Sequence, residues 1–328
     1  MKILVDAMGG DNAPLEIIKG SIDAHNEYGI DIILVGQEDV IRKVSSENNL
    51  DISDFQVVNA TEVIATDEDA DSVLKKKPDS SMTVALKMLA EGEGDAFVSA
   101  GNSGALCVGG TLLVKRIKGI KRPGFAPVMP HFGGGCFMLI DAGANLEARP
   151  EMLLQFAVMA SAYMDKVMKV ENPRVGLVNV GTEEHKGSEL QHNTFELLKN
   201  SDLNFIGNVE GRDLPYGGCD VAVCDGFTGN VILKTFEGTA KAILGKVKEL
   251  FSKNAKSKLA AALVMSDIKK LVKEFDYNEY GGAPIMGTLK PVFKAHGSSK
   301  AKTFKNALRL TKDYVEADVI NEISKAVK

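Results

Sequence analysis

Small clusters of glycine and polar residues follow the apolar runs of this sequence, one cluster after most runs. In open α/β sheets, ligands bind outside the carboxyl ends of the strands, where such clusters would gather. Several clusters also lead into helical patterns, and a helix N-terminus favours anions through its free N–H groups and its dipole. We therefore expect one polar cleft that binds an anion. Its candidate residues are Gly9, Gly10, Asp11, Gly101, Asn102, Ser103, Gly104, Asn179, Thr182, His185, Lys186, Arg212, Asp225, Gly226, Thr228, Gly229 and Asn230.

The segment Val221–Lys234, VAVCDGFTGNVILK, shows this pattern most clearly. A strand-like run ends on Asp225, and two glycines then lead into a helical run. Asp225 could simply cap that helix and satisfy its backbone donors. The convergence of the other clusters on the same sheet edge favours an active-site carboxylate instead.

A second region leaves its alternatives open. His185 and Lys186 follow Thr182 at a predicted strand-to-helix turn, where they could hold an anion or form a solvated helix start. His185, Glu189 and His192 would share one helix face. Surface helices often carry such residues by accident, so we predict no metal site.

Several familiar motifs are missing from the sequence. It has no G-x-G-x-x-G fingerprint and no Walker A motif, which disfavours a nucleotide site. The stretch Gly101–Ala105, GNSGA, misses the nucleophile elbow G-x-S-x-G because position 105 is alanine. Ser103 is therefore interpreted as a phosphate-binding or capping hydroxyl. The four cysteines form no C-x-x-C pair, which indicates neither a disulfide framework nor a zinc site.

The elements that must position these clusters alternate along the chain. Continuously apolar strands separated by amphipathic helices predict an α/β fold, with helices on both faces of a mostly parallel sheet. No linker divides residues 1–328, so one catalytic unit is predicted, with a long terminal helix over 299–327 and a polar surface excursion over 65–81. The strand candidates are 2–8, 31–36, 55–60, 95–100, 136–142, 174–180, 204–209 and 220–225, and the other helix candidates are 14–28, 83–91, 151–167 and 187–200.

The segment 241–275 differs from the rest of the chain in charge. The 328 residues carry a net charge of −5, whereas Lys241–Lys273 holds nine lysines and two acidic residues, a net charge of +7. With the apolar run Leu259–Met265, this predicts a projecting amphipathic helical segment that lies on an anionic membrane surface. A dimer-interface or core helix with solvated lysines is the alternative. The expected contacts with a membrane or another acidic partner are Lys253, Lys256, Lys258, Leu259, Leu263 and Val264.

The composition also limits where the protein is expected in the cell and which partners it is expected to bind. The sequence has no tryptophan and few aromatic residues, so a stacking platform for single-stranded nucleic acid is not expected. No apolar run approaches the roughly 18 residues that a membrane-spanning helix needs. Asp6 interrupts the N-terminus too early for a signal peptide. We expect a cytoplasmic protein that is at most peripherally attached to a membrane.

Six blocks of the sequence resemble the signature blocks of bacterial phosphate acyltransferases. They are ILVDAMGGDNAP, SAGNSGA, NVGTEEHKGSEL, FIGNVEGRD, VAVCDGFTGNVILK and YNEYGGAPIMG, in order along nearly the whole chain. The resemblance implies conversion of acyl-[acyl-carrier protein] and inorganic phosphate to acyl phosphate, for a membrane glycerol-3-phosphate acyltransferase of phospholipid synthesis. It also implies a three-layer α/β/α fold akin to isocitrate and isopropylmalate dehydrogenases, a homodimer, and no metal or nucleotide cofactor. Ser103 departs from the pattern, since many members have threonine there.

The residue types agree with that reaction. Phosphate is largely dianionic near neutrality and can attack a thioester without a serine or cysteine nucleophile. The departing thiol, with a pKa near 8.5 by analogy with cysteine, leaves readily. Such an enzyme mainly binds an anion, orients the thioester and stabilises the tetrahedral oxyanion. Glycine turns, hydroxyl and amide donors, and one or two acid/base groups are sufficient for these tasks.

We assign the expected roles accordingly. Backbone N–H groups of 101–104 and 226–230, together with Lys186, His185 or Arg212, would hold phosphate. Asn230 or a backbone N–H would support the oxyanion. By similarity to phosphotransacetylases, Asp225 would pass a proton to the leaving thiol. The basic segment 241–275 would receive the acidic carrier protein, anionic lipid, or both.

Three alternatives stay open at this point. A phosphotransacetylase would act on coenzyme A thioesters in place of the carrier protein. A nicotinamide-dependent hydroxy-acid dehydrogenase on the same fold is disfavoured by the missing glycine fingerprint and metal-binding carboxylates. A non-enzymatic membrane scaffold would have no use for polar clusters at the strand ends.

Overall fold

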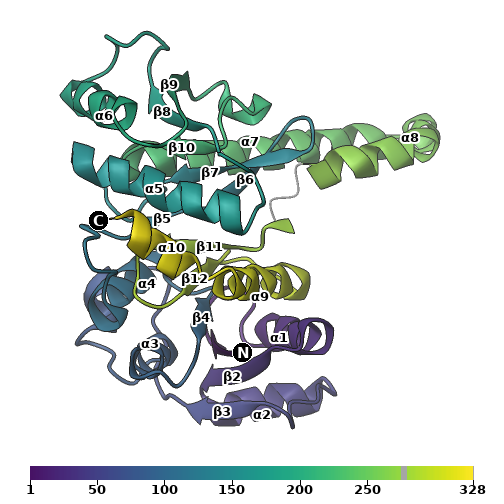
Figure 1. Cartoon of the computed structure of the whole chain (residues 1–328). Coiled ribbons are helices and arrows are strands. Elements are labelled where there is room, and N and C mark those ends of the chain that lie inside the picture. Colours follow the sequence, from purple (N-terminus) through teal and green to yellow (C-terminus); the bar gives the residue numbers. More distant parts are fainter. Residues whose placement is uncertain (275–278, 328) are drawn as a thin grey trace.

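The strands of this protein form two sheets, which lie one above the other in Figure 1. The computed structural model describes residues 1–274 and 279–327 of the chain. The larger sheet has the order β3-β2-β1-β4-β12-β11-β5 and the smaller β6-β7-β10-β8-β9. The larger sheet comprises β1 (Lys2–Asp6), β2 (Asp31–Gly36), β3 (Gln56–Asn59), β4 (Ala96–Ser99), β5 (Gly124–Phe125), β11 (Gly282–Met286) and β12 (Val292–Ala295). The smaller comprises β6 (Val128–His131), β7 (Gly135–Ile140), β8 (Val175–Asn179), β9 (Phe205–Glu210) and β10 (Val221–Val223).

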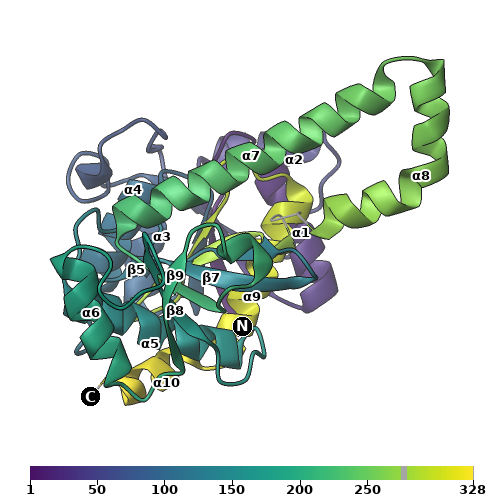
Figure 2. The ribbon, with the colours of Figure 1, turned by 90° about the horizontal axis from the view of Figure 1, so that it is seen from above.

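Most neighbouring strands run parallel, and helices lie on both sides of the sheets (Figures 1 and 2). This confirms the predicted α/β class. The antiparallel pairs are β11 with β12, β11 with β5, and β6 with β7. The helices are α1 (Leu15–Tyr28), α2 (Glu38–Glu47), α3 (Ser81–Glu91), α4 (Ser103–Gly109), α5 (Pro150–Lys166), α6 (Glu189–Lys199), α7 (Gly226–Ser252), α8 (Ala255–Glu274), α9 (Ala301–Glu316) and α10 (Val319–Ala326).

Two expectations about the elements were wrong. The division into two sheets was not predicted, because β5, β6, β11 and β12 all lie outside the strand candidates. The single helix expected over 299–327 is broken into α9 and α10. Asp318 stands between them with a φ of 49°, in the left-handed region, which an α-helix does not tolerate in its interior.

Strand β1 shows how the larger sheet is buried on both faces. Ile3 and Val5 belong to the apolar cluster that includes residues of α1 and α9, whereas Leu4 belongs to the cluster under α3. Successive side chains of a strand point to opposite faces, so both faces need apolar residues. This explains why the strand reads as a continuous apolar run and not as an alternating one.

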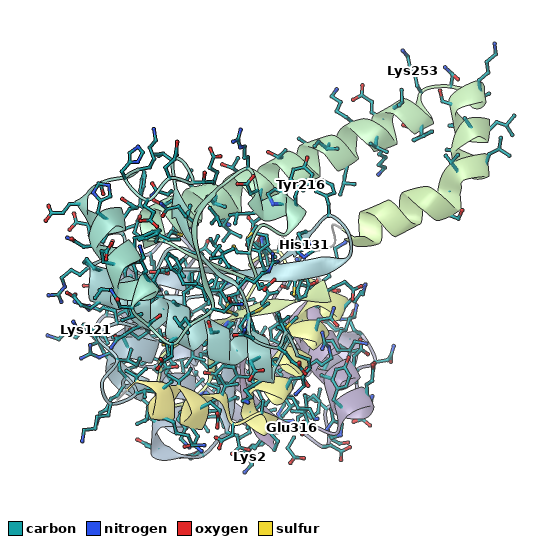
Figure 3. The ribbon with its side chains drawn as sticks, turned by 45° about the horizontal axis from the view of Figure 1, so that its top comes forward. Lys2, Lys121, His131, Tyr216, Lys253 and Glu316 are labelled. Atoms are coloured by element: carbon teal, nitrogen blue, oxygen red, sulfur yellow. The ribbon has the colours of Figure 1, made fainter. Side chains whose placement is uncertain are left out.

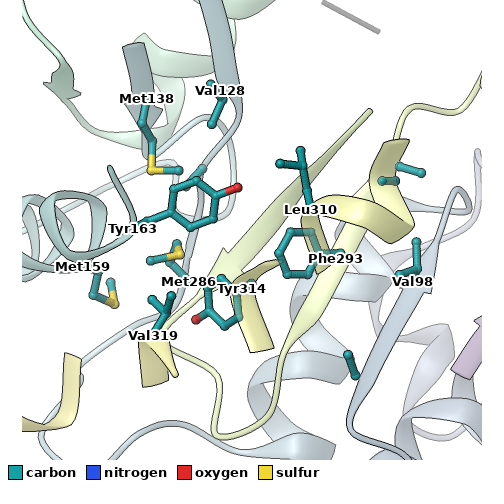
Figure 4. Close-up of a cluster of buried hydrophobic side chains, with 14 of the residues drawn as sticks. Val98, Val128, Met138, Met159, Tyr163, Met286, Phe293, Leu310, Tyr314 and Val319 are labelled. Atoms are coloured by element: carbon teal, nitrogen blue, oxygen red, sulfur yellow. The ribbon is translucent and has the colours of Figure 1, made fainter. Parts of the chain in front are cut away.

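A shared apolar core joins the two sheets (Figure 4). Tyr314 of α9 lies 5.9 Å from Tyr163 of α5 and 5.4 Å from Phe293 of β12, measured between ring centroids. Met138 of β7 belongs to the same buried cluster. The cluster therefore fixes the smaller sheet against the larger one, and with it the relative position of their carboxyl ends.

Helices α7 and α8 form a hairpin that projects from the body (Figures 1 and 2). The first turns of α7 pack against the smaller sheet, and Lys253 lies near the far end of the hairpin, as Figure 3 shows. Phe275, the last residue of the predicted basic segment, lies outside the described residues. Among the described helices, none combines the length and the apolar character needed to cross a membrane.

Candidate active site

A cavity of about 400 Å³ opens where the two sheets meet. Its lining comes from segments that follow β1, β4, β7 and β12, from β5, β6 and β11, and from the first turns of α7. Four of these segments therefore stand at carboxyl ends of strands, as expected for a ligand site in such folds. Of the predicted site residues, the cavity is lined by Asp11, Gly101, Asn102, Ser103, Gly104 and Asn230.

The turn after β4, residues 100–104, forms one polar part of the lining. Asn102 is the N-cap of α4, and its Oδ1 accepts a hydrogen bond from the N–H of Ala105 at 2.9 Å. Its Nδ2 donates to the main-chain carbonyls of Ala65, Thr66 and Glu68 at 2.8–3.2 Å. The start of α4 is thus held in place from the side, while the turn itself faces the cavity.

These bonds correct the expectation for 65–81. The stretch is more than a polar surface excursion, since Val73 is fully buried and Thr66 lines the cavity. Gly104 allows a close approach, because a Cβ there would lie 3.1 Å from the Cβ of Ala70. The segment therefore forms part of the wall beside the turn.

The turn after β10 has a different environment. Asp225 is the N-cap of α7, and its carboxylate accepts hydrogen bonds from the N–H and the hydroxyl of Thr228 at 2.9 and 2.8 Å. A Cβ at Gly226 would lie 2.4 Å from the carbonyl oxygen of Asn145, and one at Gly229 only 2.0 Å from that of Asp141. These glycines let α7 pack onto the main chain of 141–145. None of these four predicted residues, Asp225, Gly226, Thr228 and Gly229, lines the cavity.

Asn230 is the member of this motif that reaches the cavity. Its Nδ2 donates to the carbonyl oxygen of Ala142 at 3.1 Å. The left-handed Gly143 lies directly against this side chain, with a φ of 136°, so a Cβ there would lie 3.0 Å from Nδ2. The amide of Asn230 is thus oriented by the same loop that packs against the two helix glycines.

The remaining predicted residues lie outside the cavity lining. Gly9 and Gly10 pack against Asp6 and Ala100. The other five stand around the exposed loop after β8 or the turn after β9: Asn179, Thr182, His185, Lys186 and Arg212. Their proposed contacts with phosphate stay predictions.

That loop is held by its own hydrogen bonds. Asn179 Nδ2 donates to the carbonyl of Lys186 at 2.9 Å. In the turn after β9, Arg212 pairs with Glu210 at 2.5 Å. The ring of His192 bonds the carbonyl of His185 at 2.9 Å through Nε2. Within the part of the chain that the structure describes, no three His, Cys, Asp or Glu residues could hold a metal ion.

Four ionisable cavity residues were missed by the sequence prediction: Lys234, Glu237, Lys294 and His296. Glu237 accepts from Lys234 at 2.9 Å and lies 3.7 Å from the Nε2 of His296. Burial raises the pKa of Glu237, but bonds from His296 and Lys234 outweigh it and leave that pKa below its ordinary value. Asn230, Lys234 and Glu237 follow at spacings of four and three, a helical period that could have placed all three on one face.

Lys294 is the most buried of these four, with 7% of its surface exposed. Its Nζ donates to the carbonyl oxygens of Ala100 at 3.0 Å and Ala295 at 2.5 Å. Burial, and after it the nearby charge of Lys234, lowers the pKa of Lys294 to about 8. The turn 100–104 and a buried ammonium are therefore in direct contact.

Another part of the cavity lining is apolar. The apolar side chains come from β5, β6, the residues between these two strands, and α7. They include Phe125, Pro127, Val128, Met129, Leu233 and Phe236. Apolar walls with a few placed polar groups are typical of small-molecule sites. The cavity can therefore hold a carbon chain beside a group that carries negative charge.

Comparison with known proteins gives consistent results. The family model described as fatty acid synthesis protein matches residues 1–322. The phosphate acyltransferase of Thermoanaerobacterium thermosaccharolyticum is 49% identical over 100% of this chain and 97% of its own length. That of Clostridioides difficile is 43% identical, over 100% and 96% of the two chains.

Solved structures of more distant proteins show the same fold. A phosphotransacetylase from Streptococcus pyogenes matches with a TM-score of 0.66 and 16% identity, over 96% of this chain and 94% of its own. The 4-hydroxythreonine-4-phosphate dehydrogenase from Klebsiella pneumoniae matches with a TM-score of 0.52 and 13% identity, over 96% and 98%. At these identities the likeness concerns the fold alone. The full-length matches at 43% and 49% identity carry the family assignment, and the chain belongs to the phosphate acyltransferase family.

Proposed function

We propose that the cavity transfers an acyl group from acyl-[acyl-carrier protein] to inorganic phosphate, which yields acyl phosphate and free carrier protein. A phosphate oxygen attacks the thioester carbonyl, the carbon–sulfur bond of the tetrahedral intermediate breaks, and the sulfur leaves and takes the proton that the hydrogen phosphate loses, which gives the free thiol. The observation that carries the proposal is the cavity itself. It joins a polar turn and a buried ammonium to an apolar lining, at the sheet edge where ligands of such folds bind.

The residues of the cavity suit the tasks of this reaction. The Asn102 side chain takes the N–H of Ala105, so the N–H groups of Ser103 and Gly104, which have no partner within the helix, are the ones left for an anion. Asn230 keeps one amide hydrogen after its bond to Ala142 and can support the oxyanion. Proton transfer by Asp225 stays a prediction, and the position of its carboxylate on Thr228 supports a capping role.

We also propose that the α7–α8 hairpin contacts the acidic carrier protein and an anionic membrane surface. Leu259 and Leu263 are 67% and 79% exposed, which does not fit the alternative of a core helix. Lys253, Lys256 and Lys258 flank this apolar surface, and each such lysine near an anionic membrane contributes about 1 kcal/mol of attraction. A membrane-bound glycerol-3-phosphate acyltransferase would then receive the acyl phosphate close to where it forms.

The hairpin proposal can be tested by reversing three charges together, Lys253→Glu, Lys256→Glu and Lys258→Glu. We expect weaker binding to vesicles that contain anionic lipid, weaker binding of acyl-carrier protein, or both. A matched control reverses three lysines of the body, Lys43, Lys87 and Lys118. Unchanged binding of both ligands by the hairpin variant would refute this role.

A homodimer is proposed on the resemblance to the family and on exposed apolar side chains. Phe227 and Val231 of α7 are 64% and 51% exposed. Light scattering measures the particle mass directly, and a value of one chain at micromolar concentration would contradict the proposal. Replacing both residues by serine is expected to shift the mass toward one chain if α7 forms the contact.

The reaction is tested by thiol release with palmitoyl-carrier protein, with and without phosphate, and with palmitoyl-CoA in parallel. We expect release that requires phosphate and is fastest with the carrier protein. Release from the coenzyme A substrate alone would favour a phosphotransacetylase activity. Absence of phosphate-dependent release from either substrate would overturn the proposed function.

A further inference from the structure

The ionisable side chains around the cavity differ in their partners. Lys234 and His296 both contact the carboxylate of Glu237, which lies between them. Lys294 contacts main-chain carbonyls, and no carboxylate of the described residues lies within ion-pair distance of it. A buried charge without a partner of opposite charge is costly, and a buried ionisable group in a cleft is a candidate for a functional site.

We propose that Lys294 is the cation that holds the attacking phosphate in the cavity. The inference rests on the proposed function and names a binding residue for its second substrate. An ammonium group has three N–H donors, and the carbonyls of Ala100 and Ala295 take two of them. The third is available to a ligand oxygen. Since Ala100 begins the turn 100–104 and both the turn and Lys294 line the cavity, the phosphate would lie between this ammonium and the turn.

A purely structural role explains these contacts poorly. Strand β12 is already paired with β4 through Val292 with Phe97, Phe293 with Val98, and Lys294 with Ser99. The hydrogen bond from Lys294 to Ala100 therefore adds little to a connection between β12 and β4 that the sheet pairing already provides. An uncharged side chain would cost less to bury at this position, so the charge itself needs an explanation.

The titration of Lys294 is consistent with phosphate binding near neutral pH. Its pKa of about 8 keeps most of the ammonium charged at pH 7. The charge of Lys234 lowers this pKa, whereas Asp6, Cys107 and Asp11, which face Lys294 from other elements, raise it. Burial raises the pKa of Cys107 to about 12, above the range from 7.5 to 9.5, and burial also raises the pKa of Asp6. A bound phosphate would favour the charged form of Lys294 further.

The proposal is tested by measuring phosphate affinity calorimetrically and the KM for phosphate with saturating acyl-carrier protein. Lys294→Met removes the charge, and Lys294→Gln removes it but keeps an N–H donor for Ala100. A hydrogen bond to a charged group contributes about 1.5–3 kcal/mol, so affinity is expected to fall roughly 10- to 150-fold in both variants. Lys43→Met, an exposed lysine of α2, is the matched control and should leave affinity unchanged.

The outcomes separate this inference from the proposed function. Unchanged phosphate affinity in a folded Lys294→Gln or Lys294→Met protein overturns the role of Lys294, even if the wild type is an active acyltransferase. Loss of phosphate affinity in both variants supports it, whichever thioester proves to be the substrate. If neither variant folds, the wild type still decides: its phosphate affinity should fall at least fivefold between pH 7.5 and 9.5, and a constant affinity would overturn the proposal.

Discussion

Two turns of this molecule look alike in sequence and serve different purposes in the structure. Gly101–Gly104 and Gly226–Asn230 each follow a strand, contain two glycines and begin a helix whose N-cap is an Asn or Asp side chain. The first turn lines the cavity. In the second turn, the main chain of 141–145 packs against Gly226 and Gly229, and Asn230 alone reaches the cavity.

The difference arises from what lies opposite each turn. Asn102 reaches sideways to the carbonyls of 65–68 and leaves the space in front of the turn open. At the second turn, the N–H of Gly226 already donates to Asn145 at 2.8 Å. A glycine-rich strand–helix turn can therefore bind an anion only where no other segment has taken its N–H groups.

The largest effect is expected for Gly229→Ala. Its Cβ would lie 2.0 Å from the carbonyl oxygen of Asp141, so α7 or the 141–145 loop must shift. We expect the free energy of unfolding to fall by about 3 kcal/mol, the upper end of the usual cost of overpacking. Gly104→Ala is the matched variant in the open turn and should change stability by less than about 1 kcal/mol. Urea denaturation compares the two, and equal losses would remove the distinction between the turns.

The second-largest effect is expected for Lys294→Met, which should lower activity and leave stability nearly unchanged. Thiol release at limiting phosphate is expected to fall roughly 10- to 150-fold, in step with the loss of phosphate affinity. The substitution removes the cost of burying the ammonium, which is about 3 kcal/mol for a pKa lowered from 10.5 to about 8. It also removes two hydrogen bonds, and the two effects on stability oppose each other. The free energy of unfolding should therefore change by no more than about 1 kcal/mol.

The pH dependence of stability gives an independent check on Lys294. Its folded pKa of about 8 lies below the ordinary 10.5. Between these values the unfolded chain binds more protons than the folded one, so this group makes stability rise with pH across that window. Below pH 8 its burial penalty is present in full. Subtracting the stability curves of wild type and Lys294→Met from pH 7.5 to 10 should reveal this rise, and a flat difference would contradict the lowered pKa.

A smaller effect is expected at the N-cap of the second turn. Asn caps helices about as well as Asp, so Asp225→Asn should keep stability and retain thiol release within about threefold of wild type. Asp225→Ala should lose about 1 kcal/mol of stability. A loss of 100-fold or more in the folded Asn variant would instead establish the acid/base role that the resemblance suggests.

The sequence predicted some of the residues that line the cavity, for a general physical reason. Asp11, the turn 101–104 and Asn230 follow strands or begin helices at the carboxyl edge, and parallel strands bring such positions together. It could not distinguish the two glycine turns, because the segment that packs against the second one lies about 80 residues away in the chain. That packing is set by tertiary contacts and not by local pattern.

Lys294 was missed for another reason. It stands in β12, a short strand outside the candidates, and a lysine there suggests an exposed edge and not a buried position. Only the neighbouring strands β4 and β11 reveal that it is enclosed. The helical spacing of Asn230, Lys234 and Glu237 was available from the sequence and could have added two cavity residues.

The most direct test of this account is a crystal structure of the protein with bound phosphate. The account predicts the anion beside Lys294 and the first N–H groups of α4, at the open turn 100–104. Phosphate at the turn 226–230, or at Lys186 and Arg212 after β8 and β9, would contradict both the assignment of the two turns and the role of Lys294.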